Sequence, residues 1–200
     1  MLVAADEPSA AVARTLAGDA ADVVVEPFGD IWLRDTAPII ARDGADLVAT
    51  DFGFNFWGGK YDLPGDDTIG ARLAARTGLP VRTATWIFEG GAIDTDGTGL
   101  VVTTEQCLLN PNRNPAMSRA DIEAALARDL GFDRFLWLGD GLLNDHTDGH
   151  VDNLARFVGE NRLLLPEPAD ADDPNAPIYA DAAARAAAYG VDVVRMPSPG

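Results

Sequence analysis

The sequence predicts an α/β fold built from repeated units, and three observations lead to this prediction. Four segments rich in Ala and Arg have the composition of helices, and each ends at or near a glycine. Each is followed by a short run of β-branched and aromatic residues, which is typical of a strand. The helix–strand pairs recur about every 50 to 60 residues, a spacing that suits a supersecondary module. We therefore expect successive units that bury a shared core.

The expected elements alternate along the whole chain. The helix–strand pairs are 8–17 with 22–26, 67–76 with 81–86, 118–130 with 134–138, and 177–189 with 191–196. Further strand-like runs lie at 47–54, 100–104, 155–158 and 162–165. In the third helix, Ser118 is a suitable N-cap and Ile122, Leu126 and Leu130 recur at helical spacing, so we assign these apolar residues to the core.

The composition excludes several classes of function. With 200 residues, 47% of them hydrophobic, the chain can form a single domain over 1–200. It lacks a membrane-length apolar run and a signal pattern at its start, so we expect a soluble cytoplasmic protein without a membrane partner. The net charge of −17 argues against a nucleic-acid partner and is compatible with a cationic substrate. The single cysteine, Cys107, excludes an internal disulfide framework.

The stretch 144–153 contains both histidines of the chain and three carboxylates. Side chains that ionise near neutral pH and lie beside permanent acids indicate a catalytic or metal-binding site. We favour such a site here over a solvated turn. If the stretch is extended, its alternating residues His146, Asp148, His150 and Asp152 point to one side.

Carboxylates also follow the earlier helix-linked strands. Asp35 follows the first, Glu89 follows the second, and the histidine-containing stretch follows the third. Ligands of α/β folds generally lie at such strand ends, so we expect these acids to converge. Clustered carboxylates need a cation between them, and a planar guanidinium suits them because each carboxylate can accept two of its N–H donors. Trp32 could offer an aromatic face to that cation or pack in the core.

The segment 53–65 mixes aromatic residues with glycines. Such a loop can wall a pocket, and aromatic residues that close one end of a core are an equal alternative.

Three ordered motifs carry a resemblance to a known family. They are Trp-Leu-Arg-Asp-Thr at 32–36, Phe-Glu-Gly-Gly at 88–91 with 108–115 downstream, and Thr-Asp-Gly-His-Val-Asp at 147–152. Together they resemble the agmatine deiminase and bacterial-type peptidylarginine deiminase family. The resemblance implies a pentein-type α/β propeller of pseudo-symmetric modules, here incomplete because its N-terminal edge and its C-terminal, nucleophile-bearing part are absent.

The resemblance also implies a reaction. In the family, a cysteine thiolate attacks the guanidinium carbon, ammonia leaves, and water releases a ureido product; agmatine gives N-carbamoylputrescine, a step of putrescine biosynthesis. By resemblance, Asp35 and Asp152 grip the guanidinium nitrogens, and His150 moves protons. Glu89 contacts the substrate or holds the aspartates, and Asp148 supports the substrate site. No cofactor and no metal are implied.

The sequence departs from the family pattern at its nucleophile. No Gly-rich His-Cys motif occurs, and we expect Cys107 to be a buried, inert thiol. Ala37 stands where the family usually has Gly, and His146 is a further difference. We favour a truncated deiminase over one that has lost its nucleophile, because an unclosed propeller leaves unpaired edges. In either case we expect the chain alone to be catalytically silent.

Other functions stay open at this point. Peptidyl-arginine or free arginine could replace agmatine as the substrate, and a homo-oligomer is neither required nor excluded. The alternation from His146 to Asp152 would also suit a metal-dependent hydrolase that holds zinc or manganese. A non-catalytic module that binds guanidines or polyamines is the third alternative.

Overall fold

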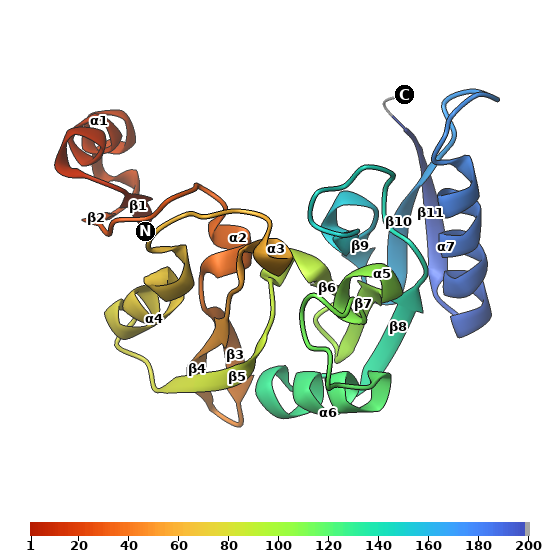
Figure 1. Cartoon of the computed structure of the whole chain (residues 1–200), viewed down its shortest axis with the longest axis horizontal. Helices are drawn as coiled ribbons and strands as arrows, with labels where there is room; N and C mark the ends of the chain where they lie inside the picture. Colours follow the sequence, from red (N-terminus) through yellow and green to blue (C-terminus); the bar gives the residue numbers. More distant parts are fainter. Residues whose placement is uncertain (199–200) are drawn as a thin grey trace.

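Four α/β units follow one another along the molecule in the computed structural model, which describes residues 1–198 (Figure 1). Their elements, unit by unit, are β1 (Leu2–Ala4), α1 (Glu7–Ala17) and β2 (Val23–Val25); β3 (Ile39–Asp43), β4 (Asp46–Gly53), α4 (Asp66–Arg76) and β5 (Val81–Ile87); β6 (Ile93–Thr95), β7 (Leu100–Thr104), α6 (Arg119–Leu130) and β8 (Arg134–Leu138); β9 (Arg156–Gly159), β10 (Arg162–Glu167), α7 (Ala176–Tyr189) and β11 (Asp192–Pro197). Short helical turns connect them: η1 (Gly18–Ala20), α2 (Leu33–Thr36), α3 (Phe56–Gly59), η2 (Gly90–Ala92), α5 (Glu105–Leu108) and η3 (Val151–Asn153).

The second, third and fourth units share one topology. In each, the central strand pairs antiparallel with the strand before it and parallel with the strand after it: β4 with β3 and β5, β7 with β6 and β8, and β10 with β9 and β11. The first unit contains the parallel pair β1–β2. A parallel pair needs a crossover connection, and α1, α4, α6 and α7 supply it. The expected repetition of one α/β unit is confirmed.

Local sequence explains where the long helices begin and end. Helix α6 begins at the expected N-cap, where Ser118 and Asp121 form a capping box, and it ends at Gly131 in a left-handed conformation with φ 81°. At the start of α1, the Asp6 side chain accepts a hydrogen bond from the Ser9 N–H. These caps satisfy backbone groups that a helix end otherwise leaves unpaired.

Two apolar cores join neighbouring units. One lies between the second and third units and contains Trp86, Phe88, Val101, Leu126 and Trp137 among others. The other lies between the third and fourth units and contains Leu100, Leu138, Val151, Leu163 and Tyr179 among others. Because each core is shared across a boundary, it holds the turns that connect the second unit to the third and the third unit to the fourth.

No helix in the described part of the chain is long and apolar enough to cross a membrane.

Candidate active site

Four acidic or basic side chains meet where consecutive units join. Asp35 lies on α2, between the first and second units, and Glu89 follows β5, between the second and third. His150 and Asp152 lie between β8 and β9, at the third junction. Their side chains converge on Gly91: a Cβ at that position would lie 2.5 Å from His150 Nδ1, 2.6 Å from Asp35 Oδ1 and 2.8 Å from Asp152 Oδ2. A glycine is therefore required there, because any side chain would fill the space these groups share.

His150 is surrounded by three carboxylates and one thiol. Its Nδ1 lies 3.7 Å from Asp35 Oδ1 and 4.0 Å from Asp152 Oδ1, while its Nε2 lies 3.6 Å from Glu89 Oε2. Nε2 and Oε2 are both buried, and neither makes a hydrogen bond among the described residues. Burial alone would lower the pKa of His150, but Cys107 and the Glu89 and Asp35 carboxylates outweigh it and raise the pKa to about 10. These neighbours therefore favour the protonated form of the imidazole.

This raised pKa predicts a pH dependence of stability. The pKa of His150 is higher in the folded chain, about 10, than its ordinary value of 6.5. Its contribution is therefore fully present below about pH 6.5 and is lost as the pH rises towards 10. From pH 7 to pH 9.5, we expect the free energy of unfolding to fall by roughly 3 kcal/mol more than in His150→Gln. Urea denaturation at both pH values measures this difference, and equal losses in the two chains would contradict it.

Two N–H donors fix the carboxylate of Asp35. The backbone N–H of Gly91 donates to Oδ1 and the indole N–H of Trp57 donates to Oδ2, both at 2.9 Å. Asp35 is buried, with 9% of its surface exposed. The plane of this carboxylate is therefore set by contacts from two different segments.

Asp152 is less enclosed than Asp35. Burial and the neighbouring Asp35 carboxylate raise its pKa, whereas His150, Arg34 and Arg156 oppose the rise. The Arg34 Nε lies 3.7 Å from Asp152 Oδ2. The carboxylates of Asp35 and Asp152 repel each other, and a cationic ligand bound between them would relieve that repulsion.

A buried arginine connects Glu89 to the loop before His150. Arg113 donates from Nε to Glu89 Oε1 at 2.6 Å, from one terminal nitrogen to Asp148 Oδ2 at 2.7 Å, and from the other to the Thr147 carbonyl at 3.0 Å. The side chains of Arg113 and Glu89 have no solvent exposure. Burial would lower the pKa of Arg113, but the Glu89 and Asp148 carboxylates raise it. The arginine therefore spans the second junction and the third.

A small cavity opens over these groups. It measures about 150 Å³ and is lined by Trp32, Arg34, Asp35, Trp57, His146, Thr147, His150, Asp152 and Asn153. Trp32 leaves 51% of its surface exposed, so of its two expected roles packing in the core is wrong. Glu89 lies behind His150 and is not part of this lining.

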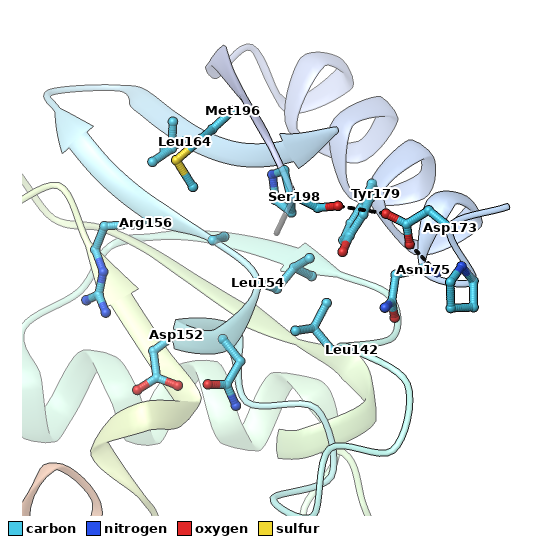
Figure 2. A pocket seen from close by; sticks show the side chains of 14 residues that line it. Leu142, Asp152, Leu154, Arg156, Leu164, Asp173, Asn175, Tyr179, Met196 and Ser198 are labelled. Atoms are coloured by element: carbon cyan, nitrogen blue, oxygen red, sulfur yellow. Dashed lines mark hydrogen bonds between the residues drawn. The ribbon is translucent and has the colours of Figure 1, made fainter. Parts of the chain in front are cut away.

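A larger cavity of about 450 Å³ lies on the other side of Asp152, and Figure 2 shows its lining. Leu142, Leu154, Leu164 and Met196 contribute apolar surface. Asp152 and Asn153 line both cavities, so the two meet at this pair.

The stretch 144–153 is not extended, and of its alternating residues His146, His150 and Asp152 line the small cavity whereas Asp148 does not. Asn144 and Asp148 have positive φ values of 60° and 65°, so the chain turns twice and sends neighbouring side chains apart. The Asp148 carboxylate points away from the small cavity to Arg113, Asn112 and Lys60, and these partners keep its pKa low despite partial burial.

The four residues His146, Asp148, His150 and Asp152 do not form one set of metal ligands, because the Asp148 carboxylate is directed to Lys60, Asn112 and Arg113. A different set, Glu89, Cys107 and His150, offers ligand atoms within 4.8 Å of one another. Two of those atoms, Glu89 Oε2 and His150 Nε2, already face each other. Cys107 is fully buried, as expected, and burial raises the pKa of its thiol. It lies behind His150 and does not line the small cavity.

Sequence reasoning missed two residues of this site. Trp57 contacts Asp35, and Arg113 contacts Glu89; each pair joins separate segments of the sequence. The mixture of aromatics and glycines at 53–65 was a signal for Trp57, since it indicated a pocket wall. Arg113 lies in the 108–115 motif and carries no local signal of its burial.

Comparisons with known proteins identify relatives of this chain. A family model described as Porphyromonas-type peptidyl-arginine deiminase matches residues 1–200. Agmatine deiminase from Stutzerimonas stutzeri is 44% identical over 160 residues, which are 76% of this chain and 44% of that relative. The structure of a C. jejuni agmatine deiminase variant with substrate bound matches with a TM-score of 0.87 at 28% identity, covering 100% of this chain and 60% of that one. Agmatine deiminase of Enterococcus faecalis gives 0.87 at 28% identity, covering 97% and 57%.

The chain spans about half the length of the curated relatives it matches. The solved structures confirm the expected pentein-type α/β fold, and the described units form an open row without closing into a propeller. A family model that matches the chain from its first residue to its last decides its membership. The chain belongs to the Porphyromonas-type peptidyl-arginine deiminase family.

Proposed function

We propose that this site binds the guanidinium group of agmatine and serves its hydrolysis to N-carbamoylputrescine and ammonia. One observation carries the proposal: Asp35 Oδ1 and Asp152 Oδ1 lie within 4.0 Å of the same imidazole nitrogen of His150, in one cavity. Two carboxylates around one small cavity suit a planar cation with several N–H donors. The relatives that carry the name agmatine deiminase support the choice of substrate.

Binding would use the two aspartates and the exposed tryptophan. Asp35 and Asp152 accept N–H donors from the guanidinium and orient its carbon. The half-exposed indole of Trp32 borders the same cavity and can cover one face of the flat cation. Glu89 contacts His150 and supports it from behind, and Asp148 acts on the site indirectly, through Arg113 and Lys60.

The chemistry would use His150 and a cysteine thiolate. Attack of the thiolate on the guanidinium carbon is followed by loss of ammonia, which takes its proton from His150. The neutral imidazole then accepts a proton from water, the hydroxide attacks the same carbon, and the thiolate leaves. Cys107 is unsuited to the first step because it is fully buried, its thiol pKa is raised, and it lies outside the cavity.

Two measurements test this proposal. Calorimetry on the chain should show binding of agmatine and no binding of putrescine, which has the same alkyl chain without the guanidinium. The protein expressed from its complete coding region should release ammonia and N-carbamoylputrescine from agmatine, whereas the chain alone should release neither. Failure of both the binding and the turnover would refute the proposal. Binding without turnover by the complete protein would instead favour a guanidine-binding module.

A further inference from the structure

Trp57 is buried against the site and contacts one of its carboxylates. Its indole N–H donates to Asp35 Oδ2 at 2.9 Å, and only 2% of its surface is exposed. The ring packs edge-on against Phe54 and Tyr61, with centroid distances of 4.9 and 5.5 Å. Its position is therefore determined by packing as well as by the hydrogen bond.

The backbone that carries Trp57 is strained. Phe56 and Trp57 have φ values of 58° and 54°, in the left-handed region that bulky residues rarely adopt. Asn55 holds this turn from both sides: its side chain accepts from the Gly58 N–H at 2.9 Å and donates to the Asn112 carbonyl at 2.8 Å. Strain of this kind persists only where surrounding contacts impose it, and it is commonly found at functional sites.

The strained turn has one consequence for the site, namely the contact with Asp35. An ionised carboxylate oxygen can accept about two hydrogen bonds, so each Asp35 oxygen keeps one free position after Gly91 and Trp57 have donated. A bidentate guanidinium needs both free positions in a fixed plane. A carboxylate held at one oxygen only could rotate away from that plane.

We propose that Trp57 is a positioning residue whose indole N–H fixes the plane of the Asp35 carboxylate for bidentate contact with a guanidinium. The inference rests on the proposed guanidine-binding function. It adds that the affinity for a guanidinium depends on Trp57, which acts through Asp35. The strained turn at 55–59 places the indole of Trp57 against the Asp35 carboxylate.

The chain offers a matched control. Trp86 is also buried, and its indole N–H donates to the Asp129 carboxylate at 3.0 Å, outside the lining of the small cavity. Trp57→Phe and Trp86→Phe each remove one indole–carboxylate hydrogen bond and keep an aromatic ring. We expect Trp57→Phe alone to weaken agmatine binding, by about tenfold in calorimetry, which corresponds to the loss of one hydrogen bond to a charged group. Equal affinities in the unchanged chain and in Trp57→Phe, or equal losses in the two variants, would overturn the proposal.

A second measurement needs no change at Trp57. In proton NMR, the indole N–H resonance of Trp57 should move upfield in Asp35→Asn and should shift when agmatine is added to the unchanged chain, while that of Trp86 stays in place. Agmatine binding seen by calorimetry with an unmoved Trp57 resonance would also overturn the proposal. An absence of agmatine binding in the unchanged chain would count against the guanidine-binding function itself. The response of the Trp57 resonance to Asp35→Asn in the free chain would still decide whether the indole reports on Asp35.

Discussion

Replacement of Arg113 by methionine should lower the free energy of unfolding by about 3 to 5 kcal/mol, because it removes one partner of a buried ion pair. Methionine fills part of the same space but donates no hydrogen bond. Glu89 would keep a fully buried carboxylate with neither oxygen hydrogen-bonded, and the Thr147 carbonyl would lose its donor. The loss should therefore be dominated by polar groups left unpaired, and to a lesser degree by packing.

Urea denaturation of the chain and of Arg113→Met measures this loss. Arg14→Met is the control, since Arg14 pairs with Glu7 at 3.2 Å on the surface of α1, where such a pair contributes less than about 1 kcal/mol. Similar losses in the two variants would show that the Arg113 contacts do not stabilise the junctions as described.

Asp35→Asn should weaken agmatine binding by at least about 30-fold, the equivalent of roughly 2 kcal/mol for one partner of a buried charge pair. The amide removes a negative charge and replaces one acceptor oxygen with a donor. Whichever way it turns, its NH₂ group faces either the Gly91 N–H or the Trp57 indole N–H. The guanidinium would therefore lose an opposite charge and a correctly placed acceptor oxygen.

The same substitution should also affect folding. The contact between two donors costs about 1 to 3 kcal/mol, while the loss of repulsion from Asp152 offsets part of that cost. Calorimetry with agmatine measures the binding and urea denaturation measures the stability. Asp133→Asn, at a side chain that is 79% exposed, should change neither. Affinity retained in Asp35→Asn would remove Asp35 from the guanidinium site.

Much of the fold could be predicted because its long elements have strong local signals. Helix α6 carries its cap and its apolar spacing in sequence, and β7 and β8 lie at the predicted residues. Strands β1, β3 and β6 were not predicted. β1 and β6 have only three residues each, and β3 ends in charged residues. None of the three strands therefore gives a clear alternating pattern. Their pairing is decided by the neighbouring strand.

Some residues of the candidate site could also be predicted from the sequence, whereas others could not. Asp35, Glu89 and the histidine-containing stretch could be associated from sequence because each follows a strand, and strand ends share one edge of an α/β unit. The alternation at 146–152 was misleading for Asp148, because turns with positive φ replaced the strand. The contacts of Trp57 and Arg113 depend on a strained turn and on a buried long-range ion pair, neither of which has a local pattern.

The position of Arg113 across two junctions also affects how the molecule opens. Three of its hydrogen bonds connect Glu89 to the loop before His150, so displacement of the Arg113 side chain releases both segments together. Amide hydrogens near Glu89 and near His150 should then exchange with solvent through a single shared opening, although the sheets on either side stay intact. In the chain, the small cavity and the groups around it would behave as one cooperative unit that is distinct from the sheets supporting it.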